Sequence, residues 1–314
     1  MVERLLILDV NSILYRAYYA LPPLTTKRGE LVNAIYGFLL VLFRVIKEFK
    51  PNYICACFDF PARTFRHKKF KEYKAQRPPC PKDLVDQIQR LKEILSAFNI
   101  PFFERKGYEA DDLIGTIVSK TQGLEKIIVS GDLDNLQLVS KETKVFVLSG
   151  VKKSTLYDEK EIERKFHGLK SHQIPELKAL IGDSSDNIPG IPGIGKKTAI
   201  RLLLTFENLD ELYKALRKNS ENTKMVDPKL KSKLLHYKDQ IFLNRELVKV
   251  KENVEIDFDI KKCQWGQYSF NTVIKVLKNL EFYSLVNRLS EIADIGEYDR
   301  IKQLQNKGQK TLFE

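Results

Sequence analysis

The sequence predicts an α/β protein in which helices flank a central, mostly parallel sheet, followed by a mostly helical region. Short apolar or β-branched runs alternate with longer runs of helical periodicity through residues 1–170. Several of the short runs are continuously apolar, as expected for strands buried on both faces of a parallel sheet. With 314 residues and 43% hydrophobic content, the chain is long enough to bury such a core.

The first predicted elements form a βαβ unit. An apolar strand ends at Asp9, and Asn11 or Ser12 can cap the short helix that follows. A long helix then ends before Pro51, ahead of a second strand that ends at Asp59. In order, strands are predicted at residues 5–9, 54–59, 100–104, 127–129, 144–148 and 154–157, and helices at 11–19, 30–49, 82–98, from 113 onward and through 202–289.

Acidic residues collect at the ends of predicted strands and at one predicted helix start. Because the carboxyl ends of parallel strands meet at one edge of a sheet, strand-end aspartates can share one cleft. Each acid alone could cap a helix or fill a turn, but so many together repel one another unless cations lie between them. Without a His or Cys cluster, such carboxylates suit Mg²⁺ or Mn²⁺ rather than zinc. The acids are Asp9, Asp59, Glu109, Asp111, Asp112, Asp132 and Asp134.

The segment from residue 63 to residue 82 carries eight basic residues against the single acid Glu72. Phe65, Phe70 and Tyr73 are interleaved with them. This mixture could form a solvated helix face, but basic and aromatic side chains together also follow a phosphate backbone and stack on bases. The net charge of +12 favours a polyanionic partner, most naturally nucleic acid, although a basic chain can also be merely soluble.

A glycine-rich turn lies between predicted helices at residues 182–199. It adds two carboxylates, Asp183 and Asp186, and its backbone N–H groups at a helix start form an anion site that nearby basic residues reinforce. The spacing also resembles a phosphate-binding loop of nucleotide hydrolases. That alternative is disfavoured because Lys197 stands where a Ser or Thr is needed and no strand feeds the loop.

Cysteine usage and hydropathy exclude several classes of protein. Four cysteines, of which only Cys55 and Cys57 are close in sequence, give neither a disulfide framework nor a zinc pattern. Reduced thiols fit a cytoplasmic protein. No apolar stretch is long enough for a membrane span, and no signal peptide is evident. We expect a monomer without membrane contact, with a flexible tail over residues 294–314.

Together these motifs resemble the structure-specific 5′-nuclease family, which includes flap endonucleases and the 5′-nuclease domain of bacterial DNA polymerase I. The resemblance runs from Leu5 to about Leu289 and is most specific at residues 108–112, 131–135 and 182–199. It implies a PIN-like 5′-nuclease fold. In this fold a nuclease core (1–170) carries a helical arch at about 63–82, and a helical DNA-binding region (171–293) carries a helix-hairpin-helix at 188–204. Because no polymerase region is present, we expect a stand-alone nuclease.

The resemblance also implies roles for individual residues. Around the first of two metal ions it places Asp9, Asp59, Glu109, Asp111 and Asp132, and toward the second Asp134, Asp183 and Asp186. Asp112 would be an outer carboxylate acting through water, Arg66 and Lys74 would contact the scissile phosphate, and Tyr15 would stack on the flanking base. DNA would be held in the arch by Lys68, Lys69 and Lys71, and at the hairpin by Gly193, Gly195, Lys196, Lys197 and Arg201, often with K⁺ on the hairpin carbonyls. The sequence departs from many members at Asn11, where they have glycine.

The expected activity is metal-dependent hydrolysis of phosphodiesters at 5′ flaps and 5′ ends of DNA, near the junction of a 5′ single strand with duplex. We expect this activity to serve replication and repair, including removal of Okazaki-fragment RNA primers. One alternative is a PIN-like ribonuclease, because a carboxylate metal site alone does not distinguish RNA from DNA. Another is a DNA-junction binding protein without catalysis. Such a protein would be expected to have lost several carboxylates of the metal site, and this sequence keeps all of them. In the tail, Gln309, Leu312 and Phe313 resemble the peptide by which bacterial proteins dock on the sliding clamp.

Overall fold

The computed structural model describes residues 2–150, 153–218 and 220–292. Its centre is a six-stranded sheet with strand order β3-β2-β1-β4-β5-β6, in which only β6 runs antiparallel to its neighbour. The predicted α/β fold with a mostly parallel sheet is therefore confirmed. The strands are β1 (Arg4–Asp9), β2 (Tyr53–Cys57), β3 (Phe102–Phe103), β4 (Glu125–Ser130), β5 (Thr143–Leu148) and β6 (Ser154–Tyr157).

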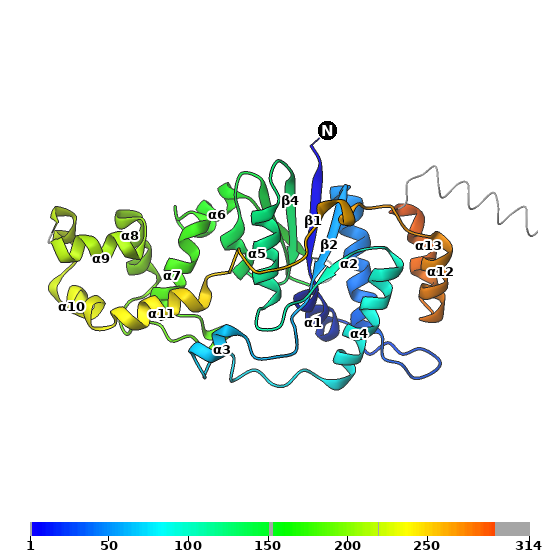
Figure 1. The fold of residues 1–314 in the computed structure, drawn as a ribbon. Helices are drawn as coiled ribbons and strands as arrows, with labels where there is room; N and C mark the ends of the chain where they lie inside the picture. The colour runs from blue at the N-terminus through cyan, green and yellow to red at the C-terminus, as the bar shows by residue number, and fades with distance from the viewer. Residues whose placement is uncertain (1, 151–152, 219, 293–314) are drawn as a thin grey trace, which may run out of the picture.

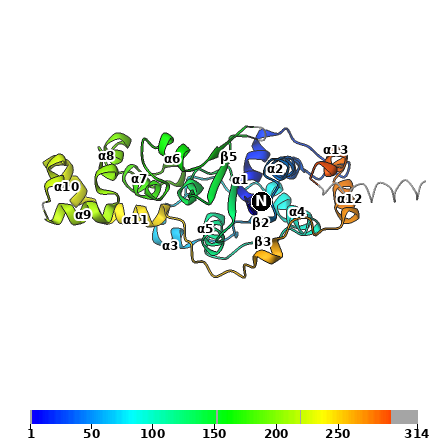
Figure 2. The same cartoon turned by 90° about the horizontal axis from the view of Figure 1, so that it is seen from above.

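The apolar strands are buried on both faces of the sheet. Along β1, Leu6 and Leu8 pack into one core and Leu5 and Ile7 into a second, as the two-residue period of a strand requires. The first core lies under α1 (Val10–Ala20), α2 (Asn33–Phe49) and α4 (Lys82–Ala97), and the second under α5 (Ala110–Lys120). The sheet is thus a layer between two helical layers (Figures 1 and 2).

A separate helical region extends from one side of the sheet (Figure 1). It has its own apolar core, which includes Leu180, Leu203 and Leu234. Within the described part of the chain, the helices of this region are α7 (Ile174–Ile181), α8 (Lys196–Phe206), α9 (Leu209–Lys218), α10 (Pro228–His236) and α11 (Lys238–Val248), and α6 (Glu159–Lys165) leads into it.

The chain then returns to the sheet, which the predicted division at residues 171–293 did not foresee. Residues 249–265 run past α5 and β3 (Figure 2), with Val250, Val254 and Cys263 in the second core. Helices α12 (Phe270–Asn279) and α13 (Tyr283–Arg288) then pack into the first core at the opposite end of the molecule from α8 to α10 (Figure 1). The predicted tail and the last residue of that region lie outside the described residues.

The predicted helical arch is mostly not helical. Only α3 (Phe65–Lys69) is a helix; residues 71–76 form turns and residues 77–81 are irregular. The prolines at 78, 79 and 81 keep residues 77–81 out of a helix, because proline lacks the N–H that a helix interior needs. We refer to residues 70–81 as the strap. Among the described residues, no helix is long and apolar enough to cross a membrane.

Candidate active site

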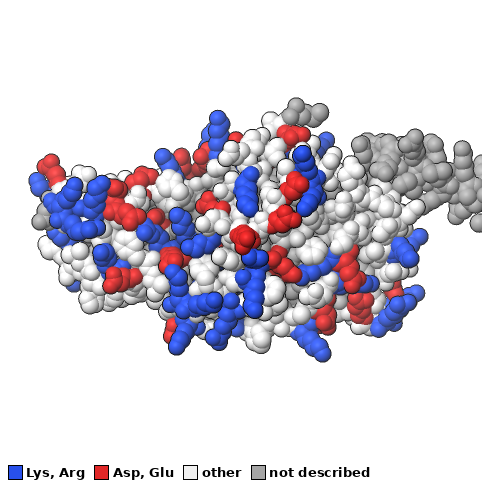
Figure 3. Space-filling model, in the orientation of Figure 1, with Lys and Arg blue, Asp and Glu red and all other residues white. Residues whose placement is uncertain are grey.

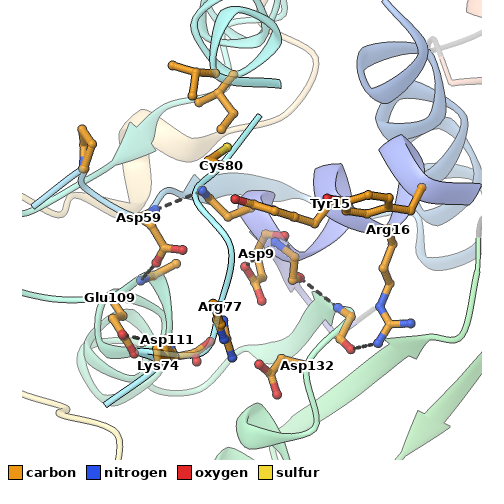
Figure 4. Close-up of a pocket in the computed structure, with 18 of the residues that line it drawn as sticks. Asp9, Tyr15, Arg16, Asp59, Lys74, Arg77, Cys80, Glu109, Asp111 and Asp132 are labelled. Carbon is orange, nitrogen blue, oxygen red and sulfur yellow. Dashed lines mark hydrogen bonds and ion pairs between the residues drawn. The ribbon is translucent and has the colours of Figure 1, made fainter. Parts of the chain in front are cut away.

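A pocket of about 880 Å³ opens at the carboxyl ends of the parallel strands. Asp9 ends β1, and Asp59 and Asp132 follow the neighbouring strands β2 and β4, so the topology brings three distant parts of the sequence together. All five carboxylates predicted for the first ion line this pocket (Figure 4): Asp9, Asp59, Glu109, Asp111 and Asp132.

The start of α5 ties one side of the pocket to β2. Glu109 is the N-cap of α5, and the N–H of Ala110 donates to Oδ1 of Asp59 at 2.8 Å. On the other side, Oδ1 of Asn11 accepts from the N–H of Asp59 at 3.0 Å. Asn11, where the sequence departs from many family members, therefore joins α1 to the loop that carries Asp59.

A serine that the sequence analysis missed holds two of the acids. The buried Ser130 hydroxyl donates to Oδ2 of Asp9 at 2.5 Å and accepts from the N–H of Asp132 at 2.8 Å. Arg16 packs against Gly131 between them: its guanidinium donates to the Gly131 carbonyl, and a Cβ on Gly131 would lie 2.0 Å from Nε of Arg16 and displace that side chain. The available signal was the position of Ser130, at the end of a strand and directly before the acidic turn.

Burial and mutual repulsion raise the pKa values of three pocket acids, Asp9, Asp59 and Asp111, so these acids ionise less readily without a cation. Burial, together with Asp59 and Asp132, raises the pKa of Asp9 to about 7. Burial and neighbouring carboxylates also raise the pKa of Asp111 well above its usual value. Burial acts the same way on Glu109, but Lys74 and Arg66 outweigh it and lower the pKa of that carboxyl.

These residues fit a hard divalent cation. The pocket lining contains carboxylates but no histidine, a donor set that suits Mg²⁺ or Mn²⁺. A bound cation would also relieve the repulsion that raises the pKa of Asp9.

The acids predicted for a second ion form a separate group. Asp134, Asp183 and Asp186 each offer an oxygen within 4.8 Å of the others. Asp134 follows β4, whereas Asp183 and Asp186 belong to the turn after α7. That turn needs glycine, because a Cβ on Gly190 would lie 2.2 Å from the carbonyl oxygen of Ile181.

Arg66 and Asp112, predicted at the scissile phosphate and in the outer metal shell, pair with each other in this structure. The Arg66 side chain is 3% exposed and forms a bidentate pair with Asp112, at 2.7 and 2.8 Å. Its Nε donates to the carbonyl of Leu247 at 2.7 Å, and Asp112 is fully buried. Neither residue lines the pocket, although Nη1 of Arg66 also lies 3.4 Å from Oε2 of the pocket acid Glu109. In this structure both residues belong to a buried ion pair next to Glu109.

The strap places other basic groups over the pocket. Lys74 lines it, as predicted for a phosphate contact, and its Nζ donates to Oε1 of Glu109 at 2.9 Å. Arg77 and Arg16 also line it (Figure 4), although the sequence analysis gave neither a role. Arg77 donates to Oδ1 of Asp186 at 2.6 Å, and its only signal was its place in the basic segment. Tyr15 lies in the pocket wall.

Outside the pocket, basic side chains gather on two surfaces. One lies at the lower edge around α3 and the other over α9 and α10 (Figure 3). The predicted arch lysines Lys68, Lys69 and Lys71 are exposed but do not line the pocket.

At the predicted hairpin, Gly195 is the N-cap of α8 and Gly193 has a φ of +78°. Ile191 and Ile194 anchor the turn in the helical core. This leaves exposed the basic residues predicted there, namely Lys196, Lys197 and Arg201. The predicted clamp-binding residues Gln309, Leu312 and Phe313 lie outside the described residues.

Comparisons with known proteins agree with this fold. The N-terminal resolvase-like domain of 5′-3′ exonucleases matches residues 4–167, and their C-terminal SAM-fold domain matches residues 169–271. A 5′-3′ exonuclease from Aquifex aeolicus is 38% identical over 292 residues, which are 92% of this chain and 96% of that protein. DNA polymerase I of Caldicellulosiruptor bescii is 38% identical over 304 residues, 96% of this chain but 35% of that protein. The chain thus spans about a third of the length of the polymerases it matches.

Solved structures share the fold at low sequence identity. T5 D15 protein co-crystallised with metal ions has a TM-score of 0.61 at 19% identity, covering 93% of this chain and 100% of that one. The catalytic core of Rad2 in complex with DNA substrate has a TM-score of 0.57 at 16% identity, covering 92% and 91%. On the domain matches and the near-complete Aquifex relative, the chain belongs to the 5′-3′ exonuclease family.

Proposed function

We propose that this protein is a divalent-metal-dependent, structure-specific 5′ nuclease that hydrolyses phosphodiesters at 5′ flaps and 5′ ends of DNA in replication and repair. One observation carries the proposal: a pocket that combines five carboxylates, from the strand ends and the start of α5, with the basic residues Lys74 and Arg77 of the strap. Family membership and the Aquifex 5′-3′ exonuclease support it.

The carboxylates would hold two Mg²⁺ ions, with Mn²⁺ as a possible substitute. Such ions supply Lewis acidity, lowering the pKa of water and neutralising charge on the attacking and leaving oxygens. The first group would hold one ion and Asp134, Asp183 and Asp186 the other. Lys74 and Arg77 would exchange their carboxylate partners for the phosphate of the DNA, and Tyr15 would offer its ring to a base.

Duplex DNA would lie along the hairpin, where Lys196, Lys197 and Arg201 are exposed at the start of α8. K⁺ at the hairpin carbonyls fits less well than the sequence suggested. Nζ of Lys233 donates to the carbonyl of Pro192 at 3.0 Å, so the chain's own ammonium already occupies one carbonyl that an ion would need. We therefore propose K⁺ there only in a state in which Lys233 has moved.

The remaining proposals rest on the sequence. They are a monomeric state, a cytoplasmic location and docking on a sliding clamp through Gln309, Leu312 and Phe313.

The deciding experiment offers the protein a 5′-flapped DNA, a matching RNA hairpin and blunt duplex DNA, with Mg²⁺ and with a chelator. We expect Mg²⁺-dependent cleavage of the flap at or beside the junction. Cleavage of the RNA alone would instead favour the ribonuclease alternative. Binding of the flap without any cleavage would favour a junction-binding protein.

A further inference from the structure

The two carboxylate groups differ in what neutralises them. In the first group, Glu109 contacts the cations Lys74 and Arg66, whereas the hydrogen bonds to Asp9, Asp59 and Asp111 come from neutral donors. These donors are the Ser130 hydroxyl, the Ala110 N–H and the Asn135 amide. In the second group every acid contacts a cation: Lys178 contacts Asp134 and Asp183, and Arg77 contacts Asp186. Ser185 also donates to Asp183, and the Tyr73 hydroxyl donates to Asp186.

Lys178 is held where it bridges two of the three acids. It lies on α7, directly before the turn that carries Asp183. Its Nζ is 2.6 Å from Oδ2 of Asp183 and also contacts Oδ1 of Asp134. The Lys178 side chain is only 21% exposed.

An ammonium and a divalent ion cannot share these oxygens. Lys178 contacts Oδ1 of Asp134 and Oδ2 of Asp183, which belong to two of the three carboxylates of this group, so an ion there would compete with the ammonium for them. An ion must therefore displace the partly buried ammonium of Lys178 from two carboxylates before it can bind. The free energy of this displacement lowers the affinity of the site for the ion.

We propose that Lys178 holds the place of the second divalent ion and weakens the binding of that ion, so that the free protein binds one ion tightly at the pocket and the second weakly. This inference rests on the proposed function, because it takes the carboxylates to be metal ligands. It adds that the two groups are unequal and names the residue that makes them so.

The test is a calorimetric titration with Mn²⁺ at about pH 8, because metal affinity falls when the ligands are protonated. Wild type should show one tight and one weak class of ion. Lys178→Met should strengthen the weak class by roughly tenfold or more and leave the tight class unchanged. Lys178→Arg, which keeps the charge, should resemble wild type.

Two further variants test whether the change in Mn²⁺ affinity is specific to Lys178 and to the second carboxylate group. Lys144 is a matched control because its Nζ pairs with Glu125 at 2.7 Å and its side chain is 33% exposed, in β5 and outside both groups. Lys144→Met should leave both classes unchanged. Adding Asp183→Asn to Lys178→Met should cancel the gain, because it removes a ligand of the second group. Thermal unfolding without metal shows whether each variant is folded, and Lys178→Gln replaces Lys178→Met if that variant is not.

The outcomes separate this inference from the proposed function. A weak class that changes by less than about twofold in Lys178→Met, beside an intact tight class, overturns the role of Lys178 alone. A wild-type protein that binds no Mn²⁺ in either class overturns the metal dependence itself, and this inference with it.

Discussion

Asp132 lies at the pocket end of β4, where its Oδ1 accepts from the N–H of Asp134 at 2.9 Å. Asp132→Asn keeps an oxygen for that hydrogen bond but removes one negative charge from the first carboxylate group. We expect cleavage of a 5′ flap to fall by at least about a hundredfold, because charge stabilisation in the transition state depends on the ions held there. Binding of DNA should be spared, because the basic surfaces are untouched.

The matched control for this change is Asp257→Asn. The Asp257 side chain is 91% exposed, and its partner Lys262 lies at 3.2 Å on the surface. Cleavage and DNA binding should both stay at wild-type levels in this variant. Cleavage by Asp132→Asn above about a tenth of the wild-type rate would remove Asp132 from the site.

Asp9 should make the metal-free protein less stable as pH rises. Its pKa is about 7 in the folded protein against 3.8 in the unfolded chain, so the folded state binds more protons between these values. The contribution of Asp9 to the free energy of unfolding is therefore present below pH 3.8 and is lost as pH rises through about 7. Asp9→Asn should stabilise the metal-free protein at about pH 8 relative to pH 5, by on the order of 1–4 kcal/mol.

Denaturant unfolding at both pH values, without metal and with Mg²⁺, measures this difference. Mg²⁺ should restore the stability of wild type at high pH, because it replaces the proton as the neutralising charge. The same stability difference between Asp9→Asn and wild type at both pH values would contradict the assignment of that pKa to Asp9.

At the scale of single residues, the sequence identified the acids of the site but not the side chains that hydrogen-bond to them. Asp9, Asp59 and Asp132 could be predicted because each follows an apolar run, and parallel strands bring such ends together. Ser130 and Arg77 could not, because a serine in a strand and one arginine among many basic residues have no periodic signal. Their roles depend on distances that only the folded chain defines.

At the scale of elements, α3 is held by a buried ion pair rather than poised over a phosphate. Arg66 joins α3 to α5 through Asp112 and to the end of α11 through the carbonyl of Leu247. Arg66→Met would leave the fully buried Asp112 without its cation, and we expect a loss of about 3–5 kcal/mol in the free energy of unfolding.

An exposed pair serves as the comparison for Arg66. Arg105 pairs with Glu255 at 3.0 Å, with the two side chains 49% and 91% exposed, so Arg105→Met should cost at most about 1 kcal/mol. Denaturant unfolding of both variants checks the contrast. Lost cleavage with unchanged stability in Arg66→Met would instead support the role at the scissile phosphate that the sequence predicted.

The hairpin before α8 should contribute to DNA affinity through charge alone. Lys196 and Lys197 are exposed in the first turn of α8, and replacing both with Ala removes two cations without emptying the helical core. We expect weaker binding to duplex-containing DNA and a smaller salt dependence, by roughly two phosphate contacts. Fluorescence anisotropy over a range of salt concentrations gives the slope.

Lys261 and Lys262 provide a matched pair of adjacent, exposed lysines beside β2, away from the hairpin. Their double replacement with Ala should leave the slope as in wild type. If the Lys196 and Lys197 variant also keeps the wild-type slope, the hairpin does not face DNA.

At the scale of the whole molecule, sequence periodicity located helices but not the core that each one joins. Residues 270–288 read as amphipathic helix, like the DNA-binding region before them, and so were assigned to it. The structure instead seats Val273, Leu277 and Leu285 against α2 and α4. An apolar stripe fixes which face of a helix is buried but carries no information about the partner, and the irregular return through residues 249–265 has no periodic signal.

The last prediction concerns the tail beyond the described residues. Gln309, Leu312 and Phe313 resemble a clamp-docking peptide, and docking would raise the local concentration of the nuclease at DNA ends without contacting its site. Deleting residues 309–314 should therefore leave cleavage of free flaps unchanged and abolish any stimulation by the cognate clamp. A milder variant, Leu312→Ala with Phe313→Ala, should do the same, whereas Gln303→Ala with Gln305→Ala should keep the stimulation. Titrating the clamp against full-length and truncated protein measures its affinity for each form. Equal affinities would mean that the tail does not dock on the clamp.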